Sequence, residues 1–300
     1  MTAKVSHSLF SRTVSGCHTA QDATWRCTAK LPAPALRRWI ASVWELDGVV
    51  PAMWERELPR GSVSIVVNLA GPHTLIDAGV ARALPAAWIT GLHEQALVTA
   101  VGGRSWTCGA RLTIEGAYRL LQVPAHELAN QVVDLESVGG RPVRQLLARI
   151  DEARTVEDRL ALLGSYLVER LTQPSHWDPV VSWALDHIVS HPSATPVAWL
   201  ARSAGWSEKR LYRRFLESVG MGPRSVARIA RFHAVLCMLH EQPTASLATV
   251  AHELGYCDQA HLAREFRELA CMTATQYLRG RAYSLDYGYA RVEPSETSKT

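Results

Sequence analysis

Four side chains of metal-binding type lie close together near the C-terminal end of this sequence. The stretch VAHELGYCDQAHLAREF, residues 250–266, holds His252, Cys257, Asp258 and His261 within ten positions of one another, around a glycine. Imidazole nitrogens, thiolates and carboxylates are the ligands of zinc sites. Whether these four could form such a site depends on the elements that position them.

An internal repeat shows what those elements are. LARSAGWSEKRLYRRF (200–215) and VAHELGYCDQAHLAREF (250–266) each have an alanine four residues before a glycine, an aromatic residue after it, and then Leu-x-x-x-Phe. Ala201 and Ala251 would let two helices approach, while Gly205 and Gly255 would supply a turn conformation that most residues avoid. The repeat therefore predicts two helix-turn-helix motifs.

The repeat also argues against a metal site. The first copy has Arg202, Ser207 and Arg210 where the second has its histidines and cysteine, so the fold does not need ligands there. His252 and His261 would lie on different helices, and their spacing fixes no tetrahedral geometry. We predict no metal and no cofactor, and we expect Ser207 and Asp258 to cap the second helix of each motif.

Composition and length suit a chain with two domains. The sequence has 300 residues, of which 47% are hydrophobic and 20% are charged, as in proteins that bury a core. Its formal net charge is +4, carried almost entirely by arginine; arginine suits phosphate and guanine contacts, although a GC-rich coding sequence gives the same bias. The six cysteines form no CxxC pair, which predicts reduced thiols.

The N-terminus has no apolar leader, and no apolar run approaches the roughly 18 residues of a membrane span. We therefore expect a cytoplasmic protein without membrane contact.

Residues 23 to about 124 alternate with a period of two. Val63, Ile65, Val67 and Leu69 would point to one side of a strand, and so would a second set comprising Trp106, Cys108, Ala110, Leu112 and Ile114. Short strands broken by Gly and Pro predict an antiparallel sandwich or barrel. The segment holds six of the ten tryptophans; we interpret them as core packing, with the lining of a ligand cavity as the alternative.

After Pro124 the period becomes helical, and an apolar stripe in 156–171 predicts an amphipathic helix; it comprises Val156, Leu160, Leu163, Leu167 and Leu171. We predict an α+β protein with a disordered N-terminus (1–22), an antiparallel β-sandwich or jelly-roll domain with C-terminal helices (23–172), an all-α domain with two helix-turn-helix motifs (173–285), and a disordered tail (286–300).

Charge separates the two motifs. Between residues 196 and 240 two acidic residues, Glu208 and Glu217, stand against eight basic ones, which are Arg202, Lys209, Arg210, Arg213, Arg214, Arg224, Arg228 and Arg231. Such a cluster on a recognition-type helix fits contacts to phosphates and the major groove, with a solvated basic face as the alternative. From 241 to 285 four basic residues stand against five acidic ones. The first motif is therefore expected to dominate non-specific affinity.

Residues 223–241 can form one helix of about 28 Å. This helix would hold the two motifs near the spacing of about 34 Å between successive major-groove faces.

Three stretches resemble the paired helix-turn-helix domain of AraC/XylS-type transcriptional regulators. They are AGWSEKRLYRRF, GMGPRSVARIARFHAVL and LATVAHELGYCDQAHLAREFRELACMTATQYLR. RELPRGSVSIVVNLAGP and GARLTIEGAYRLLQVPAHELANQVVDL resemble the β-rich sensing domain of one branch of these regulators, which implies a cupin-like jelly roll followed by helices. The usual aromatic-x-Pro-Gly-Gly-Ala stretch of that branch is replaced by residues 112–117, LTIEGA.

The resemblance implies a sequence-specific regulator that inserts two recognition helices into successive major grooves and responds to a small molecule bound in its N-terminal domain. The implied base-reading residues are Lys209, Tyr212 and Arg213 in the first motif and Gln259, Ala263 and Arg264 in the second. The predicted interface also includes Ser207, Arg210, Arg214 and His261, and for His261 a packing role is favoured over a phosphate contact.

The partners expected are double-stranded DNA, a small-molecule effector, RNA polymerase and a second copy of the chain. The alternative function is a cupin-type enzyme or DNA-repair protein with a DNA-binding appendage. A cupin metal centre would need His73, His93 and Glu94 to act together, although they are few and dispersed.

Overall fold

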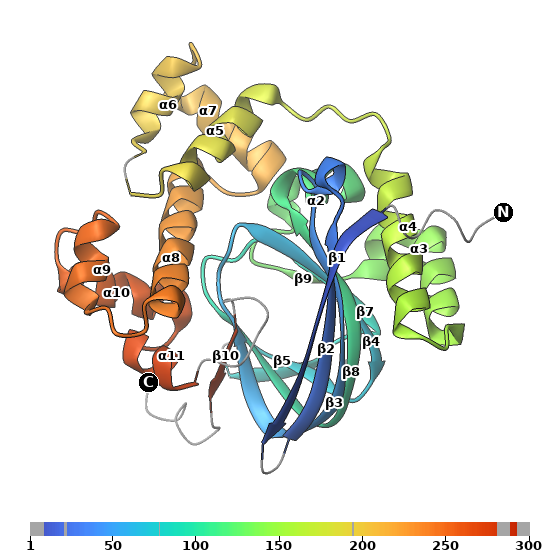
Figure 1. The fold of residues 1–300 in the computed structure, drawn as a ribbon. Coiled ribbons are helices and arrows are strands. Elements are labelled where there is room, and N and C mark those ends of the chain that lie inside the picture. Colours follow the sequence, from blue (N-terminus) through green and yellow to red (C-terminus); the bar gives the residue numbers. More distant parts are fainter. Residues whose placement is uncertain (1–8, 21–22, 78, 194, 281–288, 293–300) are drawn as a thin grey trace.

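The computed structural model describes residues 9–20, 23–77, 79–193, 195–280 and 289–292, and Figure 1 shows the arrangement of their elements. An N-terminal β-rich part precedes a C-terminal part made of helices, and the predicted α+β class is confirmed. In the described residues every strand pairing is antiparallel. The strands are β1 (Phe10–Ala20), β2 (Ala23–Pro32), β3 (Ile40–Glu57), β4 (Ser62–Ala70), β5 (His73–Asp77), β6 (Val80–Ala83), β7 (Ala87–Thr90), β8 (Leu97–Thr113), β9 (Val132–Asp134) and β10 (Tyr289–Val292).

Two long strands, β3 and β8, form the spine of the sheet. They pair along almost their whole length, from Ile40 opposite Leu112 to Glu57 opposite Leu97, with a register shift between Val50 and Met53. One end of β8 pairs with β4 and the other with β5, while β3 pairs with β2 at one end and β10 at the other. Because an irregularity of this kind bends a strand, the sheet curls around its concave face (Figure 1).

The convex face of the sheet packs on helices. The helices that follow are α2 (Ile114–Leu121), α3 (Leu135–Glu152) and α4 (Val156–Leu171), with short 3-10 turns η1 (Pro34–Leu36) and η2 (Ala125–Glu127). The alternating residues Val63, Ile65 and Val67 are buried in this layer. The predicted stripe of α4 is confirmed: its four leucines are buried there too, and Val156 is partly buried against the same core.

A buried ion pair fastens α4 to the sheet. Arg159 donates from Nε and Nη2 to the two carboxylate oxygens of Glu45 on β3, both at 2.7 Å, and both side chains are 6% exposed. The Arg159 guanidinium also donates to the carbonyl of Ala153 and lies 4.7 Å from the ring centroid of Trp106. The Trp106 indole donates to Glu45 at 3.1 Å. Each charge therefore has its partners inside the protein, as buried charges require.

The C-terminal part consists of seven helices among the residues described. They are α5 (Pro179–Ser190), α6 (Val197–Ser203), α7 (Glu208–Val219), α8 (Pro223–Glu241), α9 (Leu247–Glu253), α10 (Gln259–Ala270) and α11 (Ala274–Gly280). In Figure 1, α8 runs between α5, α6 and α7 at one end and α9, α10 and α11 at the other. The helix predicted for residues 223–241 is confirmed with the same bounds.

Two hydrophobic cores meet on α8. The larger core continues from the sheet through α3 and α4 to Leu211 and Phe215 of α7, and includes Val226 and Ile229 of α8. The second core packs α9, α10 and α11 against Phe232, whose ring meets Phe266 edge-on. One residue of the β-rich part, Leu58, belongs to this second core.

Several predicted boundaries differ from the structure. Residues 10–20 form the edge strand β1, although disorder was predicted for 1–22; β1 pairs only with β2 in the described sheet, and its sequence lacks the alternation of a strand with one buried face. Residues 289–292 of the predicted disordered tail form β10, held by backbone pairing to β3. The rest of the tail lies outside the described residues. The helical period begins before Pro124, because Ile114 starts α2, and a short strand, β9, follows Pro124.

In the part of the chain that the structure describes, no helix combines the length and apolar character of a membrane span.

Replacing Arg159 by Met should lower the free energy of unfolding by about 3–5 kcal/mol, because Glu45 would stay buried without its cation. Adding Glu45→Gln should restore part of that loss. Urea unfolding followed by circular dichroism measures both changes. The control is Arg149→Met on α3, an exposed residue, which should change stability by no more than about 0.5 kcal/mol. Equal losses for the two arginines would contradict the anchoring role.

The second prediction concerns the residue after α10. Cys271 has an exposed side chain and φ of 52°, a left-handed conformation that costs a residue with a β-carbon roughly 1–2 kcal/mol. The equivalent residue after α7 is Gly220, with φ of 89°. Cys271→Gly should therefore raise the free energy of unfolding by about 0.5–1 kcal/mol after the entropic cost of glycine. Cys271→Ala, which keeps the β-carbon, should give no such gain in thermal melts.

Candidate nucleic-acid interface

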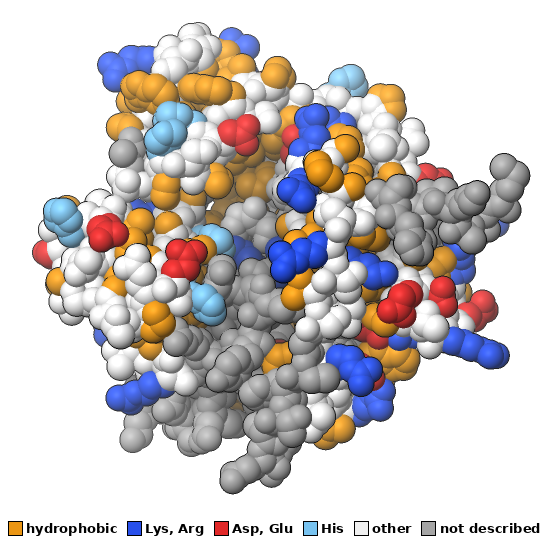
Figure 2. All heavy atoms as spheres, in the orientation of Figure 1, with side chains coloured by type: hydrophobic (Ala, Val, Ile, Leu, Met, Phe, Trp, Pro, Cys, Tyr) orange, Lys and Arg blue, Asp and Glu red, His pale blue; other side chains and the backbone are white. Residues whose placement is uncertain are grey.

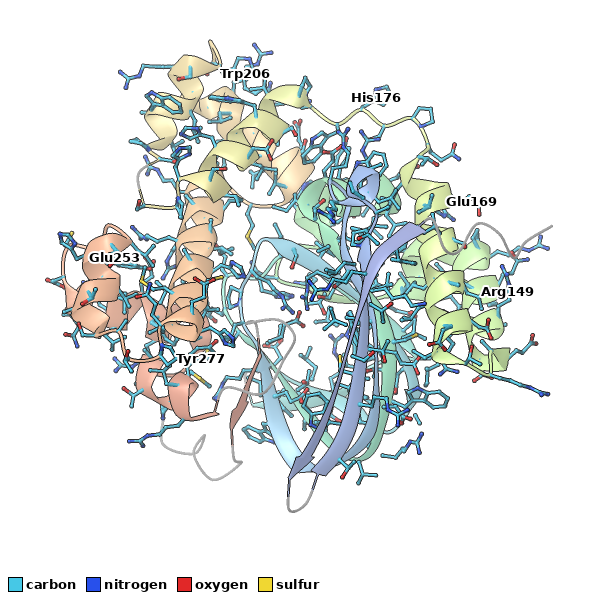
Figure 3. All side chains as sticks on the ribbon, in the orientation of Figure 1. Arg149, Glu169, His176, Trp206, Glu253 and Tyr277 are labelled. Carbon is cyan, nitrogen blue, oxygen red and sulfur yellow. The ribbon has the colours of Figure 1, made fainter. Side chains whose placement is uncertain are left out.

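The first helix-turn-helix motif consists of α6 and α7. Gly205 between them has φ of 67°, and the Trp206 amide donates to the carbonyl of Ala201 at 2.9 Å, which closes the turn. The hydroxyl of Ser207 accepts from the amide of Arg210, so Ser207 is the N-cap of α7 as predicted. Leu211 and Phe215 face inward and are fully buried. Trp206 lies at the outer end of the motif in Figure 3.

The second motif, α9 and α10, repeats this geometry. Gly255 has φ of 70°, the Tyr256 amide donates to the carbonyl of Ala251 at 2.9 Å, and Asp258 accepts from the amide of His261 at 2.6 Å. Leu262 and Phe266 are buried in the positions that correspond to Leu211 and Phe215. The sequence repeat is therefore a repeat of backbone conformation, turn bond and cap.

Most of the predicted DNA-binding side chains lie on the outer faces of the second helices. The exposed ones are Ser207, Lys209, Arg210, Tyr212, Arg213, Gln259 and Arg264, while Arg214, His261 and Ala263 are partly buried. Figure 2 shows Lys and Arg side chains at the upper edge of the molecule, over the first motif. The two second helices therefore present polar and cationic groups to solvent at the start of each helix, where a recognition helix meets base edges.

Aromatic contacts hold three of these side chains in place. The Arg210 guanidinium lies 4.4 Å from the ring centroid of Trp206. Tyr212 is 52% exposed, and its ring lies over Gly222, where a β-carbon would come within 2.5 Å of it. His261 meets Tyr256 edge-on, with ring centroids 5.3 Å apart, in keeping with the packing role favoured for it.

Arg214 has a different environment from its neighbour Arg213. Its guanidinium donates to Asp178, the N-cap residue of α5, at 3.0 Å and to Glu217 at 2.8 Å. These two carboxylates raise the pKa of Arg214. Arg213 is 71% exposed and only loosely paired, 3.8 Å from Glu217. The charge of Arg214 is thus neutralised within the protein, which favours a role in joining α5 to α7 over the predicted phosphate contact.

Two further arginines of the basic cluster join α8 to the second motif. Arg231 donates to both carboxylate oxygens of Glu265 on α10, at 3.1 and 2.9 Å, and Tyr256 donates to the same carboxylate at 2.8 Å. Arg228 pairs with Glu265 and Glu268. Two positive charges counted with the first motif are therefore cancelled by carboxylates counted with the second, and the charge difference between the motifs is smaller than the sequence predicts.

The histidines and carboxylates considered as metal ligands in the sequence do not come together in the structure. Asp258 caps α10, and His252 lies on α9, apart from His261. His73 lies against Trp88, with ring centroids 5.6 Å apart, while burial lowers the pKa of His93 to about 4 despite the nearby Glu57. Among the residues described, no three His, Cys, Asp or Glu side chains form a group that could hold a metal.

A cavity of about 930 Å³ lies between the β-rich part and α8. Its walls include Trp25, Trp44 and Trp88, so the alternative interpretation, the lining of a cavity, holds for three of the six N-terminal tryptophans, although Trp25 also packs with Val101 in a small core. The side formed by α8 carries residues spaced three or four apart, which are Val226, Ala230, His233, Ala234, Cys237, Met238 and Glu241. Sequence analysis missed this face because α8 is apolar on several sides and two of those sides contact cores.

Comparison with known proteins gives matches to separate parts of the chain. Residues 200–280 match a family model described as a helix-turn-helix domain, and residues 29–134 match one described as a domain of unknown function. Two proteins, from Streptomyces antibioticus and Streptomyces lividans, are each named "Putative AraC-like transcription regulator" and are 34% identical over 101 residues. That match covers 33% of this chain and 33% of each relative.

Solved structures also show likeness. ToxT from Vibrio cholerae is 12% identical, with a TM-score of 0.46, over 79% of this chain and 96% of its own. The C-terminal domain of AraT from Geobacillus stearothermophilus is 21% identical, with a TM-score of 0.34, over 37% of this chain and 93% of its own. The family match over residues 200–280 and the two motifs described above agree: this part of the chain is a helix-turn-helix domain, and the chain is similar over 101 residues to proteins named AraC-like transcription regulators.

Proposed function

We propose that this protein is a sequence-specific transcription regulator that binds double-stranded DNA through both motifs. The observation that carries the proposal is the repeated geometry of α7 and α10, each capped, each exposed at its start, and each packed on the single helix α8. The 19 residues of α8 span about 28 Å, a length suited to placing two recognition helices in successive grooves. RNA polymerase and a second copy of the chain are the further partners proposed.

Within this proposal, Lys209, Tyr212 and Arg213 read bases for the first motif, and Gln259, Ala263 and Arg264 read bases for the second. Arginine and glutamine can form paired hydrogen bonds with guanine and adenine edges. The exposed Ser207 and Arg210 lie where contacts to phosphate would position α7. Arg214 is assigned to the fold instead, because Asp178 and Glu217 already bind its guanidinium.

The cavity beside α8 is the proposed site of the small-molecule effector. A molecule bound there would touch the helix that carries both motifs, so it would favour one arrangement of them over another if its affinity for the two arrangements differs. We propose no enzymatic activity.

The proposal is tested by selecting binding sites from random duplex DNA with the full-length protein, followed by footprinting. Two protected major-groove half-sites about one helical turn apart are expected. A protein that protects only one half-site, or binds all sequences equally, would contradict the use of two motifs.

Arg264→Ala should cost about 1–3 kcal/mol of binding free energy, mainly at one base pair of the second half-site, because a lost guanine contact removes discrimination there. The measurement is a titration against operators that differ by one base pair at a time. Arg213→Ala is the matched control, since its loss should fall on a base pair of the other half-site. Losses spread evenly over all operators would show phosphate contacts instead.

Arg213 and Arg214 should behave differently although they are adjacent. Arg213→Ala is expected to weaken DNA binding mainly at one base pair, because an exposed guanidinium no longer reaches a base edge. Arg214→Ala should lower the melting temperature by loosening α5 from α7, and the folded variant should keep the original salt slope. A reduced salt slope for Arg214→Ala would show that this residue contacts phosphate and would contradict its assignment to the fold.

A further inference from the structure

The concave face of the sheet carries an aromatic row. Backbone pairing places Ala29, Trp44, Gly109, Val66 and Trp88 side by side across β2, β3, β8, β4 and β7. All but Gly109 are among the residues that line the cavity. Two indoles therefore flank a floor made by a glycine and a valine.

The absence of a side chain at Gly109 lets the Trp44 indole lie against that floor. A β-carbon on Gly109 would come within 2.7 Å of the Trp44 ring and 2.3 Å of the Ile65 carbonyl oxygen. The Trp44 indole thus lies against the backbone of β8 instead of standing away from it. Flat aromatic groups stack on such surfaces, and aromatic pairs contribute beyond the area they bury.

The next row on the same face is polar. It lies two positions away from the aromatic row on each of four strands, and it comprises Ser42, Arg111, Ser64 and Thr90, which backbone pairing places side by side. Ser64 donates to Glu57 at 3.1 Å, and Glu57 also accepts from Arg60 at 2.7 Å. This end of the cavity therefore holds two guanidinium groups and one carboxylate that is already engaged.

Both guanidinium groups act on titratable side chains that face this end. Burial lowers the pKa of His233 on α8, and Arg60 and Arg111 lower it further. Arg111 also opposes the rise that burial causes in the pKa of Cys27. Glu55 and Glu241 line the cavity as well; Glu55 lies two residues before Glu57 on β3, and Glu241 lies at the last turn of α8.

We propose that the cavity binds an aromatic carboxylate, with its ring between Trp44 and Trp88 and its carboxylate at Arg111. The two adjacent rows are complementary to a ligand with one apolar half and one anionic end. Arginine suits a carboxylate because its planar donors match the two oxygens. His233 places α8 beside that end. The ligand class refines the effector site of the proposed function, but the binding itself does not depend on DNA.

Calorimetric titration of the full-length protein, without DNA, tests the ligand class with three probes of one shape. 2-Naphthoate is expected to bind about tenfold to a hundredfold more tightly than 2-naphthylmethanol or 2-naphthylmethylamine, because only the carboxylate forms charge-assisted bonds with arginine. Decanoate, an aliphatic carboxylate, should bind more weakly than 2-naphthoate. Equal affinity for the alcohol, tighter binding of the amine or of decanoate, or no binding of 2-naphthoate would overturn the proposal.

Variants then test the location. Arg111→Gln should weaken 2-naphthoate binding at least tenfold, whereas Arg104→Gln, on the same strand but 56% exposed and paired with Asp47, should leave it unchanged. Trp44→Leu should weaken 2-naphthoate more than decanoate. Melting curves without probe show whether each variant is folded, and the series of probes on the unaltered protein decides the ligand class if Arg111→Gln does not fold.

Binding of 2-naphthoate by a protein that selects no DNA site would refute the proposed regulator and leave this inference intact. Selective DNA binding without any binding of 2-naphthoate would refute this inference and leave the proposed regulator intact.

Discussion

A single helix, α8, is shared by three packing environments, and the arrangement of the molecule depends on that sharing. Val226 and Ile229 contribute to the core that runs from the sheet to the first motif, while Phe232 and Leu236 contribute to the core of the second. A third side, which includes Ala230 and His233, closes the cavity. Because a helix transmits displacement along its length and packed cores resist gradual deformation, a change at the cavity wall reaches both motifs through one rigid element.

Ion pairs decide which positive charges remain unneutralised at the surface of the first motif. Arg228 and Arg231 hold α10 to α8 through Glu265, and Arg214 holds α7 to α5 through Asp178. A salt bridge with a largely buried carboxylate loses much of its stabilising effect if its cation turns toward another anion. The arginines left at the surface of the first motif are therefore fewer than the sequence suggests. The second motif is less acidic than its composition implies, because two of its carboxylates, Glu265 and Glu268, are used in these pairs.

The sequence predicts the two motifs well because their chemistry is local. A glycine with positive φ, an N-cap and a Leu/Phe pair lie within sixteen residues of one another, and each demands a particular residue type. In the β-rich part, only the face of the sheet that packs on helices could be predicted from the sequence. Alternating Val63, Ile65 and Val67 mark the side that packs on helices. The cavity side carries a mixture of aromatic, polar and charged residues, which sequence analysis cannot distinguish from a solvent-exposed face.

Other features were missed because they depend on contacts between distant residues. Asp178 is 36 positions from Arg214, and Glu45 is 114 positions from Arg159. The edge strands β1 and β10 are held by backbone pairing, which leaves little trace in the pattern of side chains. The helix α2 is short, and its first residue, Ile114, continues the alternation of β8, so the end of the strand cannot be recognised from periodicity.

The β-rich part also touches both motifs directly. Near the first motif, η2 packs on α7 closely enough that a β-carbon on Gly220 would meet the Ala125 carbonyl oxygen at 2.5 Å. Near the second, the Ala96 amide donates to the carbonyl of Leu269 on α10 at 2.7 Å, and Leu58 is buried in the core of that motif. Since these contacts lie toward opposite ends of α8, the spacing between the recognition helices is constrained by the sheet as well as by the connecting helix. The placement of the two motifs relative to each other is then a property of the whole chain, and a change in the curvature of the sheet around the cavity would alter it without any change in the motifs themselves.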